Sequence, residues 1–366
     1  MQEKYISLQN TKLDYKITGE GLPVVLIHGF AEDSSIWDNQ VEYLKNDYQL
    51  IIPDLPGSGA SGMINTLVSE GEGLGVRPIG MEDYAECIKH ILDEEKIGKC
   101  IMIGHSKGGY ITLAFAEKYP ASLISFGLFH SSAYADDDAK VEIRKKAIGF
   151  IETNGTEAFL KTSIPGLFYD RGNSNQPDAL IEEKHSSGHL SERSLKSDSQ
   201  EVTSRVDASS GHLFERSPES DSQEVARRVD ASRGHLFERS PKSDSQEVAR
   251  RIDALLEKGK AFSPKALIQY YNAMIARPDR TNILKNNNSP VLFIMGEHDK
   301  AVPFKHSLAQ SYMPFQSYIH ILRNSAHMGM LEEPERANEI LANFLLYLQA
   351  NNYGRTALLS ILQSNK

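Results

Sequence analysis

The 366-residue chain contains only two cysteines, Cys87 and Cys100, and no long apolar run. Two cysteines exclude a disulfide framework and a zinc site built from several thiolates. A membrane-spanning helix needs about 20 mostly apolar residues, and no run approaches that length. The first residues, MQEKYISLQNTKLDYKITG, alternate between polar and apolar side chains and lack the apolar stretch of a signal peptide. These absences predict a soluble cytoplasmic protein.

The chain also lacks an excess of basic residues. It has 40 lysine and arginine residues and 49 aspartate and glutamate residues, which gives a net charge of −9. A general nucleic-acid binder needs a basic face, so this balance argues against a nucleic acid as partner. Hydrophobic residues make up 40% of the chain, which is enough for the core of one large domain or two ordinary ones.

An internal repeat interrupts the chain. Residues 186–208, 209–231 and 232–254 are three copies of one 23-residue unit. When each copy is read from its histidine, the second and third agree at 18 of 23 positions, which indicates a tandem duplication. A packed solenoid would need an apolar ridge in each unit, but these units are rich in serine and charged residues. We therefore expect residues 186–254 to form a largely solvated insertion whose copies contain at most short helices.

Outside the repeat, apolar runs alternate with helical patterns. Most of these runs are almost continuously apolar, as is typical of strands in a parallel sheet that is covered on both faces. The first residues instead indicate an antiparallel hairpin at the sheet edge. This alternation predicts an α/β fold with a mostly parallel central sheet flanked by helices. The expected strands are 22–30, 48–57, 99–106, 123–132, 290–299 and 317–327, and the clearest helical stripes are 81–92 and 340–348.

The same pattern divides the chain into four parts. The region before the last two strands contains no convincing strand, but has amphipathic periods over 139–153 and 264–276. We expect this region to form a helical cap above the sheet, with the repeat embedded in it. The four parts are a core sheet (1–133), the helical cap (134–280, including 186–254), the completion of the core sheet (281–350) and a polar C-terminal extension (351–366).

The first chemical motif is Gly104-His105-Ser106-Lys107-Gly108, which matches the pattern G-x-S-x-G. It follows the apolar strand CIMI and precedes the helical segment YITLAFAEKY. A serine on such a strand-to-helix turn is exposed on a strained backbone, and its neighbours must be small because the chain segments approach closely. The N-terminus of the helix also points at the place where negative charge develops. This context favours Ser106 as a catalytic nucleophile over a structural serine.

A serine nucleophile needs a base and a group that orients this base. His327 follows the last expected strand, and Asp299 follows the strand before it. Taken alone, each is equally explained as a loop residue or a helix cap. Together with the serine they lie just beyond the carboxyl ends of three strands, where the ligand crevices of parallel sheets are found. We assign His327 as the base and Asp299 as the acid, with Asp136, Asp137 and Asp138 as alternatives for the acid.

An oxyanion hole needs two amide donors. One is expected from Lys107, directly after the serine, and the other from Phe30, in the turn after the first parallel strand. The side chains of His28 and Lys107 are the expected substrate-binding groups. The cation of Lys107 would favour acidic substrates if it faces the acyl pocket, and the alternative is that it points along the helix surface. For His28, the adjacent glycine favours a role in shaping the loop over a role as a base.

These motifs resemble those of the α/β-hydrolase fold superfamily, in its small serine esterase and lipase-like branch. The resemblance covers about 1–183 and 255–350 and leaves the repeat outside. It implies that Ser106, His327 and Asp299 form a catalytic triad, and it implies neither a cofactor nor a metal. The chain departs from the family pattern in the repeat and at Lys107, where an apolar residue is more usual. The motifs that carry the resemblance are His28-Gly29-Phe30, Asp54-Leu55-Pro56-Gly57-Ser58-Gly59, the Ser106 motif, Gly296-Glu297-His298-Asp299 and Ser325-Ala326-His327.

The leading prediction is a serine hydrolase that cleaves a carboxylic ester in a small molecule through an acyl-enzyme. The same fold also allows an aminopeptidase, a C–C bond hydrolase or a cofactor-free haloperoxidase, because a fold does not settle a function. A catalytically weak, hydrolase-derived binding protein, with the repeat as its interaction arm, is an alternative from another class. A metal site built from His189, His212 and His235 is disfavoured, because duplication alone explains their equal spacing and no further ligand completes the set.

Overall fold

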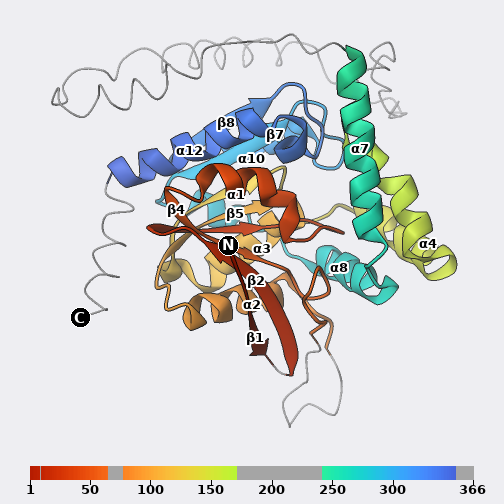
Figure 1. The fold of residues 1–366 in the computed structure, drawn as a ribbon, viewed down its shortest axis with the longest axis horizontal. Coiled ribbons are helices and arrows are strands. Elements are labelled where there is room, and N and C mark those ends of the chain that lie inside the picture. Colours follow the sequence, from red (N-terminus) through yellow and green to blue (C-terminus); the bar gives the residue numbers. More distant parts are fainter. Residues whose placement is uncertain (9, 65–76, 171–240, 352–366) are drawn as a thin grey trace, which may run out of the picture. The chain divides into compact units, whose positions relative to one another are not determined.

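The computed structural model describes residues 1–8, 10–64, 77–170 and 241–351 (Figure 1). The chain divides into two compact units, of which one comprises residues 1–170 and 245–366 and the other residues 171–244. The fold and the site described below belong to the first unit. Within the described ranges, no helix is long and apolar enough to cross a bilayer.

An eight-stranded sheet forms the centre of this unit, in the order β1-β2-β4-β3-β5-β6-β7-β8. β1 pairs with β2, and β2 with β4, in antiparallel orientation, whereas the other neighbouring strands are parallel. The expected hairpin therefore lies at one edge of a mostly parallel sheet. The strands are β1 (Gln2–Leu8), β2 (Thr11–Thr18), β3 (Leu22–Ile27), β4 (Tyr48–Pro53), β5 (Cys100–His105), β6 (Leu123–Phe129), β7 (Val291–Gly296) and β8 (Ser317–Leu322).

Helices cover both faces of the sheet, which explains why every residue of β3, β5 and β7 is buried. On one face α1 (Asp38–Leu44) packs on α12 (Pro334–Ala350), and on the other α2 (Met81–Glu94) packs on α3 (Lys107–Lys118) (Figure 1). The predicted fold class is thereby confirmed. The shorter helices are η1 (Ser34–Trp37), η2 (Pro120–Ser122), α9 (Thr281–Lys285), α10 (Phe304–Ser311) and α11 (Gly329–Glu332).

Helices and no strand occur among the described residues between β6 and α9. α8 (Pro264–Ala276) coincides with the predicted helix, because Ser263 caps its first turn and Pro264 suits its first position. α4 (Asp138–Ser163) is longer than predicted, and Gly155, with φ of +81°, breaks its helical backbone. α4 packs against α8, and η3 (Pro165–Leu167) follows α4. The boundaries of the four predicted parts stay a prediction.

The repeat enters the described residues only at its end, in α7 (Pro241–Gly259). Residues 171–240, which hold the first two copies and the start of the third, lie outside the described residues, as do 352–366. One face of α7 packs against the core through apolar side chains at helical spacing, namely Val248, Ile252, Leu255 and Leu256. The prediction of a largely solvated insertion is therefore wrong for this face of the third copy, which contains Val248 and Ile252.

Candidate active site

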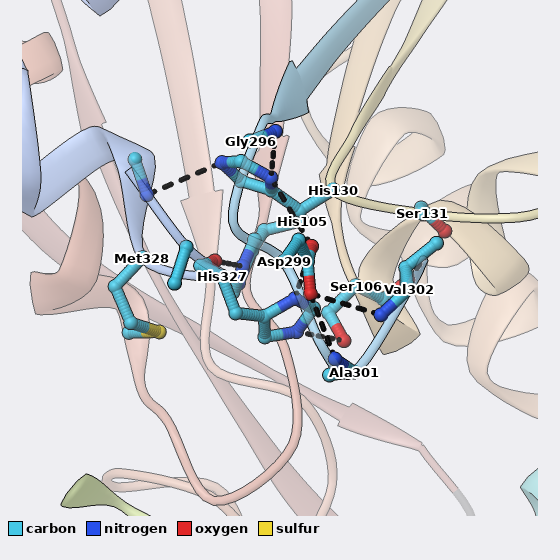
Figure 2. Close-up of polar contacts among 12 residues, drawn as sticks. His105, Ser106, His130, Ser131, Gly296, Asp299, Ala301, Val302, His327 and Met328 are labelled. Atoms are coloured by element: carbon cyan, nitrogen blue, oxygen red, sulfur yellow. Dashed lines mark hydrogen bonds and ion pairs between the residues drawn. The ribbon is translucent and has the colours of Figure 1, made fainter. Parts of the chain in front are cut away.

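Ser106 lies on the tight turn between β5 and α3 (Figure 2). Its φ of +49° falls in the left-handed region, which a non-glycine residue rarely adopts. A Cβ on Gly104 would lie 2.3 Å from the backbone of Gly108, and a Cβ on Gly108 would lie 2.4 Å from the carbonyl oxygen of Ile27. The two glycines of the motif therefore allow the close packing of β3, β5 and α3 that holds Ser106 in this conformation.

The structure brings together the three residues that were predicted to cooperate (Figure 2). The Nε2 atom of His327 lies 2.9 Å from the Oγ atom of Ser106, and its Nδ1 atom lies 2.8 Å from Oδ2 of Asp299. Because an ionised carboxylate only accepts hydrogen bonds, this contact places a proton on Nδ1 and leaves Nε2 free to accept the serine proton. The arrangement can therefore move a proton from Ser106 to His327.

Asp299 is held as a buried carboxylate. Its Oδ1 atom accepts hydrogen bonds of 2.9 Å from the amides of Ala301 and Val302. Burial would raise the pKa of Asp299, but the charge of His327 and the hydrogen bonds from His130 and His327 hold it below its ordinary value. Asp299 is therefore ionised at neutral pH.

The alternative acids have other partners. Asp136 pairs with Arg277 at 2.9 Å and also with Arg144, and the side chain of Asp137 accepts the amide of Lys140 at the start of α4. Asp138 is exposed. The structure thus places Asp299, and not one of these three, against His327.

The predicted oxyanion donors lie on the two segments next to Ser106. Lys107 is the first residue of α3, where helical amides have no partner within their own helix. Phe30 follows β3, and its ring packs on Tyr271 of α8 with centroids 4.4 Å apart. The role of both amides stays a prediction.

The side chains of His28 and Lys107 are fully buried. His28 accepts the amide of Leu55 at Nε2 and faces the carbonyl oxygen of Gly29 at Nδ1, each at 3.0 Å, which ties β3 to the loop after β4. Burial, helped by the charge of Lys107, lowers the pKa of His28 to about 4. Their contact with a substrate stays a prediction.

The Lys107 amine lies against the rings of Tyr270 and Tyr84. Its Nζ atom lies 3.1 Å from the ring centroid of Tyr270 and 5.6 Å from that of Tyr84. This atom has no hydrogen-bond partner among the described residues. Burial lowers the pKa of Lys107 well below its ordinary value. The lysine therefore occupies a site in which an apolar side chain of similar length would also fit.

Several polar residues near this site were not predicted from the sequence. His130 follows β6, and its Nδ1 atom lies 3.3 Å from Oδ2 of Asp299. Glu332 accepts the amides of Ala326 and Met328, on either side of His327, at 3.0 Å each. Burial raises the pKa of Glu332 to about 7.

Glu32 and His105 form a further buried pair, 3.0 Å apart. The position of His105 inside the serine motif was the one available signal for this pair. No cluster of three or more potential metal ligands occurs in the described part of the chain, and His189, His212 and His235 lie outside it.

Comparison with known proteins agrees with this architecture. A family model described as alpha/beta hydrolase fold matches residues 23–153. A thermophilic esterase from Thermogutta terrifontis superposes with a TM-score of 0.66 at 22% identity, over 95% of this chain and 99% of the other. An esterase from Exiguobacterium antarcticum gives a TM-score of 0.64 at 16% identity, over 94% and 99%. The chain therefore has the α/β-hydrolase fold.

Curated relatives match over shorter segments. A Petunia hybrida protein named Karrikin insensitive 2 receptor CA is 38% identical over 97 residues, which are 26% of this chain and 33% of the relative. A pimeloyl-[acyl-carrier protein] methyl ester esterase from Legionella pneumophila (strain Corby) is 34% identical over 103 residues, or 28% and 35%. The matches thus span about a third of the length of these relatives.

Proposed function

We propose that this protein is a serine hydrolase that cleaves a carboxylic ester of a small molecule. The observation that carries the proposal is the 2.9 Å contact between Ser106 Oγ and His327 Nε2, with Asp299 on the other ring nitrogen. This arrangement supplies a nucleophile, a base and a group that orients the base, all within hydrogen-bond distance. The likeness to solved esterases supports a hydrolase by analogy of fold.

In the proposed reaction, Ser106 Oγ attacks the ester carbonyl carbon while its proton passes to His327 Nε2. The amides of Phe30 and Lys107 stabilise the negative oxygen of the tetrahedral intermediate. The intermediate collapses to an acyl-enzyme, and His327 gives its proton to the departing alcohol. A water molecule then repeats the two steps and releases the acid. Asp299 keeps the imidazole oriented and stabilises its charged form throughout.

A fluorophosphonate probe tests the proposal without knowledge of the substrate, because it reacts only with an activated serine. We expect the wild-type protein to be labelled and the Ser106→Ala variant to remain unlabelled. A panel of esters that differ in acyl length, alcohol and charge then defines the substrate class. An unlabelled wild-type protein would instead support the alternative of a binding protein derived from a hydrolase, which also agrees with the likeness to a protein named as a receptor.

A further inference from the structure

A second series of hydrogen-bonded polar groups lies next to Ser106, His327 and Asp299. It begins at the amide of Gly29, which donates a 2.6 Å hydrogen bond to Oε2 of Glu32. The same carboxylate oxygen lies 3.0 Å from Nδ1 of His105, and Nε2 of His105 lies 2.9 Å from the carbonyl oxygen of His327. These hydrogen bonds thus join the turn that holds Phe30 to the backbone of His327.

The hydrogen-bond partners of His105 determine its protonation state. The carbonyl oxygen of His327 can only accept, so Nε2 of His105 carries a proton and donates it. The other ring nitrogen faces a carboxylate, which also accepts. Burial would lower the pKa of His105, but the charge of Glu32 and the hydrogen bonds with Glu32 and with the His327 carbonyl oxygen raise it. Glu32 and His105 therefore form a charged pair.

This pair is deeply buried, and the local sequence is shaped to accommodate it. His105 is fully buried and Glu32 is 6% exposed. A Cβ on Gly29 would lie 2.8 Å from Nδ1 of His105 and 2.9 Å from Oε2 of Glu32, so any larger residue there would displace one of these two side chains. Trp37 meets the His105 ring edge to face, with centroids 6.5 Å apart.

Folding stability alone does not account for such a pair. Removing two charges from water costs as much as their attraction gains, and apolar residues of similar volume are often as stable in their place. The contacts of Glu32 and His105 instead lead to the two parts of the site that must keep a fixed separation. One part is the turn that carries the predicted oxyanion donor Phe30, and the other is the segment that carries the base.

We propose that Glu32 and His105 are positioning residues, which hold the Phe30 amide and the His327 ring in the relative geometry that ester hydrolysis requires. The inference rests on the proposed function. A displacement of about 1 Å at a reacting group can cost roughly 100-fold in rate, so a link of this kind acts on kcat more than on KM. Neither side chain touches the substrate in this scheme.

The experiment combines Glu32→Leu, His105→Phe and the double variant. Oε2 of Glu32 accepts two hydrogen bonds, and leucine has no acceptor, so Glu32→Leu breaks both of them. With p-nitrophenyl acetate as the probe substrate, we expect each single variant to lose about 10-fold or more in kcat with little change in KM. The double variant should lose no more kcat than the worse single variant, because either change breaks the same link.

Two further measurements separate positioning from general destabilisation. Each single variant leaves one buried charge unpaired and should unfold at a lower temperature, whereas the double variant has no buried charge and should regain stability without regaining kcat. The Nδ1 proton of His327, observed by NMR, should shift in all three variants. Ser125→Ala is the matched control, because it removes a 2.6 Å buried hydrogen bond to the carbonyl oxygen of Pro290, outside the site. It should lower stability and leave kcat unchanged.

The inference is overturned if wild-type protein is labelled by the fluorophosphonate while Glu32→Leu keeps the wild-type kcat. It is also overturned if kcat recovers together with stability in the double variant, which would indicate a purely structural pair. An unlabelled wild-type protein would refute the proposed function itself, so the two failures are distinguishable.

Discussion

His327 Nε2 lies 2.9 Å from Ser106 Oγ, although 221 positions of sequence separate the two residues. The sheet explains this contact, because Ser106 follows β5 and His327 follows β8, and parallel strands present their carboxyl ends at one edge. Asp299 follows β7, which lies beside β8 at the same edge.

Ser106→Ala and His327→Ala should each lower kcat by roughly 10³-fold to 10⁶-fold, and the double variant should be hardly worse than either. The two residues act as one proton-transfer unit, so the loss of either disables both. Steady-state hydrolysis of p-nitrophenyl esters measures the effect. Near-normal turnover by one of the single variants would remove that residue from the mechanism.

Asp299→Asn should lower kcat by about 10⁴-fold while the protein stays folded. The amide can donate a hydrogen bond to Nδ1 of His327, which favours the tautomer whose Nε2 carries a proton and cannot take one from Ser106. Asp137→Asn is the matched control, because asparagine also caps a helix and Asp137 lies at the start of α4. Equal activity of both variants would show that the acid lies elsewhere.

Lys107→Met separates the side chain from the amide of this residue. Methionine keeps the apolar stem and removes an amine that has no hydrogen-bond partner among the described residues. Because the amine is buried against Tyr270, we expect the same change in kcat/KM for neutral and carboxylate-bearing esters, and an unfolding temperature no lower than that of the wild type. A selective loss of more than about fivefold on the carboxylate-bearing esters would show that the amine binds an anionic group.

The strands and α8 could be predicted from the sequence because short segments of the chain carry the signals for them. Strands buried on both faces appear as continuous apolar runs, and Ser263-Pro264 marks a helix start. The geometry of the serine turn was also predictable, because its glycines sit at fixed positions around Ser106. These features need no knowledge of distant residues.

The pairing of Glu32 with His105 could not be predicted in this way, because the two residues are 73 positions apart and the serine motif that contains His105 does not specify a partner for this histidine. The packing of α7 was missed for a different reason. Its Val248 has a counterpart in every copy of the repeat, so the pattern did not distinguish the copy that packs. Only the third copy continues into Leu255 and Leu256, which complete the apolar face.

His130 should make stability depend on pH. Burial lowers its pKa to about 4, whereas in the unfolded chain its pKa is near 6.5. Between these values the unfolded chain binds a proton that the folded protein does not, so the free energy of unfolding falls as pH falls through this window. By pH 4.5 the loss from this one residue is about 2–3 kcal/mol.

Urea unfolding of the wild type and of His130→Gln at pH 7.5 and pH 4.5 measures this contribution. The variant lacks the titrating ring, so its stability should fall by about 2–3 kcal/mol less between the two pH values. Equal losses in both proteins would show that His130 does not remain neutral when folded.

Deleting residues 186–231 should leave an active hydrolase whose unfolding temperature lies within about 2 °C of that of the wild type. This deletion removes two whole units and keeps the third, which leads into α7, and all predicted site residues lie outside it. Longer connections add only about 0.6 kcal/mol of closure cost per doubling, so the shorter chain loses little. Differential scanning fluorimetry and ester hydrolysis check both expectations.

Deleting residues 186–254 is the informative comparison, because it also removes Val248 and Ile252, which pack on the core, and Arg251, which donates to the carbonyl oxygen of Leu331. Partial burial of two apolar side chains contributes roughly 2 kcal/mol, which for a chain of this size corresponds to an unfolding temperature lower by about 3 °C. Trypsin should accordingly cut at Arg205, Arg227 and Arg228 before it cuts at Arg251. If both deletions melt alike, the contacts of α7 do not contribute to stability, and the third copy is as dispensable as the first two.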